Sequence, residues 1–168
     1  MADFRIYAPL LHNLEKGISN RKSDRGGFTV DGITLTTFRR FYGASMTRED
    51  LMKITPEQWC HIMKTGYWDI CKADEIRSQR LAEIIADWCV NSGTERIRNV
   101  QTILGVRPDG CVGPITLKAI NEADEPDLYG RIMSARKAWF NRIVMADSEQ
   151  ECNLTGWMNR LKRLENHE

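Results

Sequence analysis

The sequence predicts a mainly α-helical protein with one small β-hairpin. Apolar residues recur three or four positions apart in at least six segments of the 168-residue chain, which is the spacing of amphipathic helices. Only the stretch FTVDGITL, residues 28–35, alternates apolar and polar residues around an Asp-Gly pair typical of a two-residue hairpin turn. No repeat, low-complexity tract or Ser/Pro-rich linker divides the chain, so one mainly helical body is expected.

The first predicted helix carries a long apolar stripe. Its members are Phe4, Tyr7, Leu10, Leu11, Leu14 and Ile18. Gly17 suits a helix end, so the helix should stop near this residue. Pro9 is expected to be tolerated only near the first turn, because proline has no N–H to donate within a helix.

Six further helices follow from caps and periodicity. Thr55 has the features of an N-cap, with Pro56 at the first helical position and Gln58 as its capping-box partner. The remaining helices are expected at about 78–92, at 97–104 before Gly105, after Pro114, after Pro126 and around 157–164, with the helix after Pro126 the longest.

The composition excludes several partners. The chain has 24 basic and 23 acidic residues, a net charge of +1, and neither half is strongly basic, so nucleic acid is not an expected partner. No apolar run reaches the roughly 18 residues of a membrane span, and the N-terminus lacks the basic and apolar regions of a secretory signal. We therefore expect a soluble chain that is synthesised in the cytoplasm and does not insert into membranes.

The cysteines and histidines favour neither disulfides nor metal. The five cysteines are odd in number, widely spaced and without a C-x-x-C pair, so they are expected to be buried thiols of a reducing compartment. The three histidines are also scattered. The sequence therefore predicts no metal site and no cofactor.

Glu15 stands out at the end of the first predicted helix. It shares the flank of the apolar stripe and occupies the last turn, where the helix dipole disfavours a negative charge. Partial burial and the dipole would both raise its pKa, provided that the neighbouring cations point to solvent. A carboxyl group that keeps its proton near neutral pH is what a general acid needs.

Asp24 and Thr29 follow in a loop that can fold back over this helix end. The Gly26-Gly27 pair allows a tight turn between them. Two carboxyl groups, one neutral and one ionised, are the working parts of glycoside hydrolysis, and their separation decides inversion or retention. On spacing alone, however, such residues are more often ordinary surface residues.

The run LEKGISNRKSDRGGFTVDGIT, residues 14–34, resembles the signature of glycoside hydrolase family 108, the N-acetylmuramidases with a lysozyme-like fold. The matching positions are Glu15, Gly17, Asn20, Asp24, Gly26, Gly27, Thr29, Gly32, Ile33 and Thr34. The resemblance implies that Glu15 is the general acid, that Asp24 positions or activates water, and that Thr29 helps to hold that water. It also implies cleavage of the β-1,4 bond between N-acetylmuramic acid and N-acetylglucosamine in bacterial peptidoglycan.

The resemblance continues along the chain. Residues 67–68 and 86–93 are similar to two further segments of the family, and we assign Trp68, Asp87 and Asn91 to substrate binding on that basis. A structural tie between helices for Asp87 and Asn91, and a core position for Trp68, are the alternatives.

Residues 100–120 resemble helical peptidoglycan-binding modules. We therefore expect a lysozyme-like muramidase region at 1–94 and a helical peptidoglycan-binding-like region at 95–168 packed on it, or one compact unit. In the second region, Asp109, Gly110 and Gly113 are expected to shape a turn.

Three positions depart from the family pattern. Lys16 and Ile18 replace a glycine and a tyrosine after Glu15, and Asp31 replaces a tyrosine before Gly32. They leave open a second interpretation, a catalytically weakened or inactive peptidoglycan-binding or interaction protein of the same fold. The family's phage and prophage lysins suggest release through a holin, after which the protein would act on the cell wall.

Overall fold

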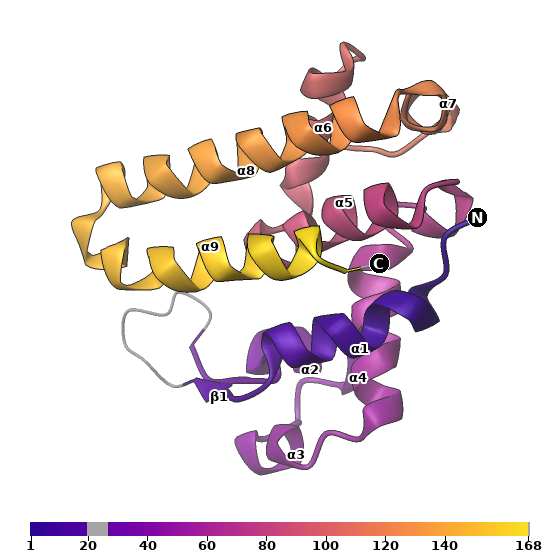
Figure 1. The fold of residues 1–168 in the computed structure, drawn as a ribbon. Helices are drawn as coiled ribbons and strands as arrows, with labels where there is room; N and C mark the ends of the chain where they lie inside the picture. Colours follow the sequence, from indigo (N-terminus) through magenta and orange to yellow (C-terminus); the bar gives the residue numbers. More distant parts are fainter. Residues whose placement is uncertain (20–26, 168) are drawn as a thin grey trace. The chain divides into compact units, whose positions relative to one another are not determined.

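The structure is a computed structural model that describes residues 1–19 and 27–167 (Figure 1). Helices dominate it, and the strands are short, so the predicted mainly α, lysozyme-like fold is confirmed. The chain forms two compact units. We call Arg5–Gly66 the N-terminal unit, and Met1–Phe4 together with Tyr67–Glu168 the C-terminal unit.

Helix α1 (Phe4–Glu15) contains the predicted apolar stripe except Ile18, which lies on the following strand and is exposed, and it ends two residues before Gly17, as expected. Tyr7 and Leu11 are fully buried, whereas Pro9 between them is exposed. Pro9 is the sixth residue of the helix, so the expectation that it stands in the first turn is wrong. The helix passes through the proline, because apolar burial on both sides outweighs one missing hydrogen bond.

The predicted hairpin is present and has a third strand. Strand β2 (Thr29–Val30) pairs with β3 (Ile33–Thr34), and the turn residues Asp31 and Gly32 have φ angles of 46° and 78°. Positive φ at both positions is what a type I′ turn requires. Strand β1 (Ile18–Ser19) adds to the other edge of β2 and was not predicted, because two residues show no recognisable alternation.

Among the described residues of the N-terminal unit, three further helices follow the hairpin. Helices α2 (Leu35–Tyr42) and α3 (Arg48–Met52) were not predicted, although Thr34 and Thr47 cap them through their hydroxyl oxygens. Helix α4 (Pro56–Met63) begins with the predicted capping box, in which Gln58 Oε1 accepts from the Thr55 N–H at 3.0 Å. It continues as a π-helical turn, Lys64–Trp68.

The C-terminal unit contains the other predicted helices. Their ends lie close to the expected positions, except that the last helix, expected around 157–164, already begins at Glu151. They are α5 (Gln79–Ser92), α6 (Ile97–Leu104), α7 (Pro114–Glu122), α8 (Glu125–Ala146) and α9 (Glu151–Glu165), with short 3-10 turns at Ala73–Glu75, Thr94–Arg96 and Ser148–Gln150.

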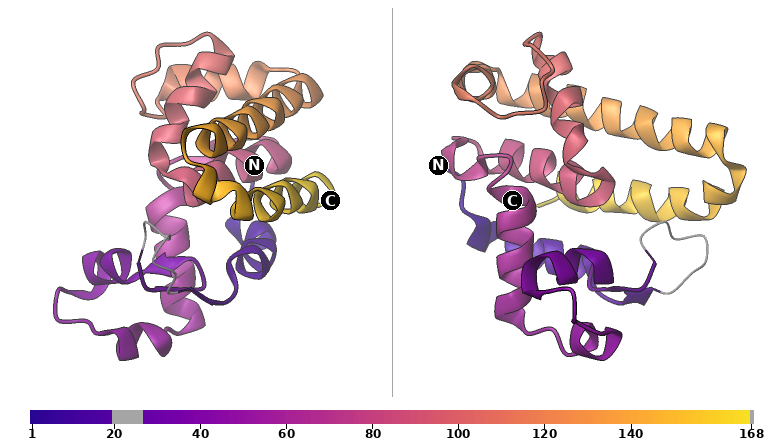
Figure 2. Two further views of the ribbon diagram at one scale, coloured as in Figure 1. Left: turned by 90° about the vertical axis from the view of Figure 1, so that its left-hand side faces the viewer. Right: turned by 180° about the vertical axis from the view of Figure 1, so that it is seen from behind.

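Helix α5 is the central helix of this unit. Every residue from Leu81 to Cys89 is buried, so the helix is covered on all sides. It packs against α8, which runs antiparallel to α9 as its neighbour (Figures 1 and 2). None of the described helices has both the length and the apolar composition needed to cross a bilayer.

The predicted boundary at residue 94 stays a prediction. The compact units of the structure divide between residues 66 and 67, and α5 groups with α6–α9.

The expectation that all five cysteines are buried is wrong: Cys71 and Cys89 are buried, Cys60 is half-buried, and Cys111 and Cys152 are exposed. The last two lie at a turn and at the start of a helix, where side chains meet solvent.

Candidate active site

Glu15 is the last residue of α1 and is half-buried. Its carboxylate lies against the turn of the hairpin. A methyl group on Gly32 would be only 2.8 Å from Glu15 Cδ and closer still to Oε2. Gly32 therefore supplies both the positive φ of the turn and the space that the carboxylate occupies.

Asp31 joins this turn to the end of α1. Its Oδ1 accepts a hydrogen bond from the Gly17 N–H at 2.8 Å, and its own N–H donates to the Gly17 carbonyl at 2.8 Å. The tie lies two residues beyond Glu15, so it holds the hairpin turn beside the candidate acid. Asp31 stands where the family pattern has a tyrosine, and its side chain bonds the backbone at the end of α1.

Two aromatic rings support the same turn from α1 and α4. The indole N–H of Trp59, which is 4% exposed, donates to the Asp31 carbonyl at 2.9 Å. The ring of His12 packs edge-on against Trp59 with centroids 5.0 Å apart, and its Nε2 lies 3.6 Å from Asp31 Oδ2. Backbone and side chain of Asp31 are thus anchored by both helices.

Thr29 stands on β2 of the same hairpin. Its hydroxyl donates to the Gly27 carbonyl at 3.1 Å, and its neighbours in register are Ser19 and Thr34. The third predicted catalytic residue, Asp24, lies outside the described residues. The structure thus places Glu15 beside the hairpin that carries Thr29, and the role of the trio stays a prediction.

Trp68 belongs to the C-terminal unit and is 1% exposed. Its indole N–H donates to Asp74 Oδ1 at 2.6 Å, and its ring packs edge-on against Phe4 with centroids 5.6 Å apart. A ring buried in this way presents no face on which a sugar can stack. The structure therefore gives Trp68 a core position in place of the assigned substrate contact.

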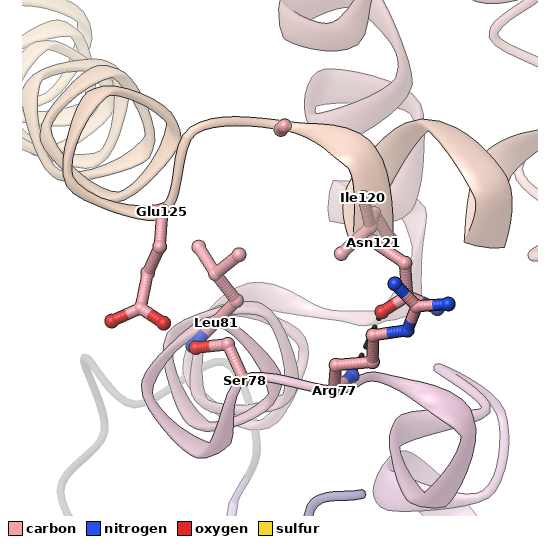
Figure 3. Close-up of a pocket in the computed structure, with 7 residues that line it drawn as sticks. Arg77, Ser78, Leu81, Ile120, Asn121 and Glu125 are labelled. Carbon is pink, nitrogen blue, oxygen red and sulfur yellow. Dashed lines mark hydrogen bonds between the residues drawn. The ribbon is translucent and has the colours of Figure 1, made fainter.

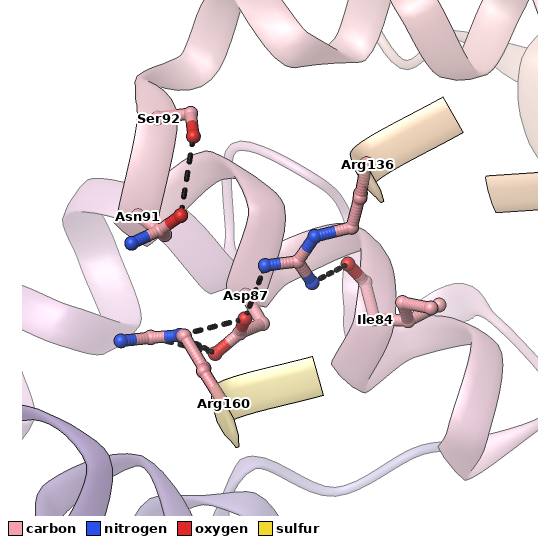
Figure 4. A network of polar contacts seen from close by, with 6 residues as sticks. All are labelled: Ile84, Asp87, Asn91, Ser92, Arg136 and Arg160. Carbon is pink, nitrogen blue, oxygen red and sulfur yellow. Dashed lines mark hydrogen bonds and ion pairs between the residues drawn. The ribbon is translucent and has the colours of Figure 1, made fainter. Parts of the chain in front are cut away.

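Asp87 is completely buried between two arginines (Figure 4). Arg160 from α9 donates hydrogen bonds to both carboxylate oxygens. Its Nε lies 2.9 Å from Oδ2, and its terminal nitrogen lies 2.7 Å from Oδ1. Arg136 from α8 donates to Oδ2 at 2.7 Å and to the Ile84 carbonyl at 3.3 Å. The carboxylate joins three helices and is not available to substrate, so its assignment to substrate binding is replaced by a structural role.

The charge state of Asp87 follows from the same contacts. Burial alone would raise the pKa of this carboxyl group, but the charges of Arg160 and Arg136 and their hydrogen bonds outweigh it. The pKa therefore lies well below its ordinary value, and Asp87 is ionised at neutral pH.

Asn91 lies one turn further along α5 and is partly exposed. Its side-chain oxygen accepts a hydrogen bond from Ser92 Oγ at 3.2 Å (Figure 4). A partly exposed amide can still bind a sugar hydroxyl, so substrate contact by Asn91 stays a prediction.

Asp109, Gly110 and Gly113, in the region that resembles peptidoglycan-binding modules, shape a turn, as expected. The buried amide of Gln101 donates to Asp109 Oδ1 at 2.8 Å and to Thr116 Oγ1 at 3.1 Å, and its oxygen accepts from the Gly110 N–H at 2.8 Å. The N–H of Cys111 and the Gln101 amide bond the Asp109 carboxylate and lower its pKa. These polar groups therefore bond to one another within this segment of the chain.

A depression of about 230 Å³ opens in the C-terminal unit (Figure 3). Its lining residues are Arg77, Ser78, Leu81, Ile120, Asn121, Ala123 and Glu125. Asn121 accepts from the Arg77 N–H at 2.8 Å and donates to the Glu75 carbonyl at 3.0 Å, so it joins α7 to the segment before α5. The depression contains no predicted site residue.

Sequence reasoning did not find several residues that build these sites. Trp59 and His12 support the turn beside Glu15, and Arg136 closes the Asp87 network. Asp31 was noted as a departure from the family pattern, and the predicted Asp-Gly hairpin turn was the available signal for its structural role. No local pattern pairs Asp87 with Arg136, because 49 positions separate them. Across residues 1–19 and 27–167, no group of three or more His, Cys, Asp or Glu side chains could hold a metal ion.

The fold has a close counterpart among solved structures. SagA of Brucella abortus superimposes with a TM-score of 0.83 at 25% sequence identity, over 96% of this chain and 90% of that chain. No curated protein sequence matches this chain.

Two family models match consecutive parts of the chain. Residues 95–162 match the model described as a predicted peptidoglycan domain. Residues 9–93, slightly more than half of the chain, match glycosyl hydrolase 108, and this match includes Glu15 and the hairpin beside it. The chain therefore belongs to the glycosyl hydrolase 108 family.

Proposed function

We propose that this protein cleaves the β-1,4 bond between N-acetylmuramic acid and N-acetylglucosamine in peptidoglycan, with Glu15 as the general acid. Family membership makes the chain a glycoside hydrolase that acts on peptidoglycan. The observation that carries the finer proposal is the position of Glu15 at the end of α1, half-buried and held against Gly32 by a tied turn.

The proposed reaction uses the two carboxyl groups in different roles. Protonated Glu15 gives its proton to the glycosidic oxygen while the bond from that oxygen to the muramic acid carbon breaks. Asp24, as a carboxylate, takes a proton from the attacking water or stabilises the oxocarbenium-like transition state. Thr29, on the strand that leads into the Asp31–Gly32 turn, holds that water through its hydroxyl. These roles rest on the family pattern.

Product analysis of digested peptidoglycan tests the proposal. Reduction of the released fragments with borohydride should convert N-acetylmuramic acid ends, because a muramidase frees the anomeric carbon of that sugar. Glu15→Gln should lower the rate by about 10²–10⁴-fold, which is the usual contribution of a general acid. Glu49→Gln is the matched control, since Glu49 is an exposed residue of the same unit. Equal rates for wild type and Glu15→Gln would remove Glu15 from the mechanism.

The departures from the family pattern favour one alternative, a catalytically weakened or inactive wall-binding protein. Ile18, which replaces an aromatic residue, is 65% exposed and offers no ring for stacking on sugars. In that case wild type would sediment with purified cell walls and release no fragments. Binding together with fragment release would exclude this alternative.

Access to peptidoglycan requires passage out of the cytoplasm. We propose release through a holin, as the family's phage and prophage lysins suggest. The protein should then reach the medium of holin-producing cells only. Its appearance in the medium of intact, holin-deficient cells would contradict this route.

A further inference from the structure

Two buried cysteines lie with their sulfur atoms in contact in the C-terminal unit. Cys71 Sγ and Cys89 Sγ are 3.5 Å apart, and both residues are 0% exposed. Cys71 stands in the turn that precedes α5, where its N–H donates to the Tyr67 carbonyl at 3.1 Å, and Cys89 lies on α5 itself. Neither residue takes part in the proposed reaction.

We propose that Cys71 and Cys89 are a redox pair that is reduced in the cytoplasm and forms a disulfide once the protein reaches an oxidising compartment. A disulfide has a sulfur–sulfur distance near 2.05 Å, so the two atoms need to approach by about 1.5 Å. The oxidising compartment is where peptidoglycan lies, and this part of the inference rests on the proposed function.

The oxidant is a small-molecule or protein disulfide. One cysteine thiolate attacks it, forms a mixed disulfide and releases the first thiol. The second cysteine then attacks the mixed disulfide and releases the second thiol. The protein loses two protons and two electrons, and the oxidant becomes two thiols.

Burial and the hydrogen bond between the sulfur atoms keep Cys71 and Cys89 reduced until the folded chain opens locally, or until the chain folds after release. The hydrogen bond between the sulfur atoms, together with burial, raises the pKa of the Cys71 thiol. Because the thiolate is the reactive form, the folded pair reacts slowly and its oxidation follows local opening, or folding after release. The other cysteines differ: Cys60 is half-buried, and Cys111 and Cys152 are exposed.

The disulfide would close a short loop, because 18 positions separate the two cysteines. A loop of this size restricts the unfolded chain enough to raise the Tm by roughly 5–10 °C in a protein of this length. The bond would join the turn at Cys71 to the central helix α5, whose residues from Leu81 to Cys89 are buried.

Refolding in a glutathione buffer tests the pair directly. The test protein carries Cys60→Ser, Cys111→Ser and Cys152→Ser, so that only the pair remains, and wild type is mapped in parallel in case these changes impair folding. The reduced, denatured chain is refolded at an extracellular ratio of oxidised to reduced glutathione, trapped with an alkylating agent and digested. We expect one cross-linked peptide pair containing Cys71 and Cys89, and a Tm higher by roughly 5–10 °C that dithiothreitol reverses.

A natively refolded protein in which both cysteines are alkylated, or carry glutathione, would overturn the inference. Cys89→Ala is the control, and it should show no Tm difference between oxidised and reduced samples. No readout depends on lytic activity, so failure of the disulfide and failure of the proposed muramidase function are distinguishable.

Discussion

Gly32 lies directly against the carboxylate of Glu15, and a methyl group at this position would stand 2.8 Å from Glu15 Cδ. The residue thus does two things at once. It provides a φ of 78° for the hairpin turn, and it leaves room for the proposed general acid.

Gly32→Ala should therefore impair catalysis more than folding. The positive φ costs about 1 kcal/mol of stability in an alanine, and the methyl group displaces the flexible Glu15 side chain from its place. A 1 Å misplacement of a catalytic group can cost about 10²-fold in rate. Gly105→Ala is the control, because Gly105 has a φ of 72° with no atom within 4 Å of an added methyl group. Peptidoglycan turnover measures the loss of catalysis, and urea unfolding measures the loss of stability. Equal turnover in Gly32→Ala and Gly105→Ala would contradict the contact between Gly32 and the Glu15 carboxylate.

Asp31→Asn should keep most of the stability that Asp31→Ala loses. Asparagine retains an oxygen for the Gly17 N–H and tolerates the φ of 46° at this position. Alanine lacks the acceptor and is strained, so it should lower the free energy of unfolding by about 1–3 kcal/mol. Urea denaturation compares the two. If asparagine is as damaging as alanine, the negative charge facing His12 matters more than the hydrogen bond.

Asp87→Asn should lower the free energy of unfolding by about 3–5 kcal/mol, because it leaves two buried guanidinium groups without their counter-charge. Glu122→Gln removes one member of an exposed ion pair with Lys118 and should cost less than about 1 kcal/mol. Chemical denaturation of both variants gives the comparison. A loss of similar size in both would show that the Asp87 network contributes no more than a surface ion pair.

The same network should make the protein sensitive to acid. The pKa of Asp87 is lower in the folded than in the unfolded protein, so its contribution is complete above the ordinary carboxyl pKa of about 4. As the pH falls below this value, the unfolded state binds a proton at Asp87 that the folded state does not bind. The free energy of unfolding therefore falls by up to about 1.4 kcal/mol per pH unit. Denaturation between pH 5 and pH 2 should show a shallower fall for Asp87→Asn. Identical slopes would indicate that Asp87 does not bind this proton on unfolding.

A fragment of residues 1–94 should fail to fold cooperatively. It keeps α5 but loses α8 and α9, whose Arg136 and Arg160 neutralise Asp87. It also exposes the buried surface of α5 between Leu81 and Cys89. Circular dichroism and thermal unfolding, with the full chain as control, measure this. A sharp thermal transition in the fragment would support the sequence boundary at residue 94 as a structural one.

Much of the fold could be predicted, because its signals are local. The capping box at Thr55 and Gln58 and the helix end at Gly105 are encoded within a few residues. The same holds for the Asp31–Gly32 turn, where positive φ needs these residue types. Helix α2 and helix α3 were missed, since they are short and their apolar stripes are incomplete.

The sequence by itself determined most of the helices, the hairpin, the family signature and the place of Glu15 at a helix end. The tertiary structure decided what surrounds those residues. It buried Trp68, turned Asp31 into a backbone tie and enclosed Asp87 between arginines. Asp87 and Arg160 are 73 positions apart, and burial and charge pairing depend on which distant segments meet, which no local pattern encodes.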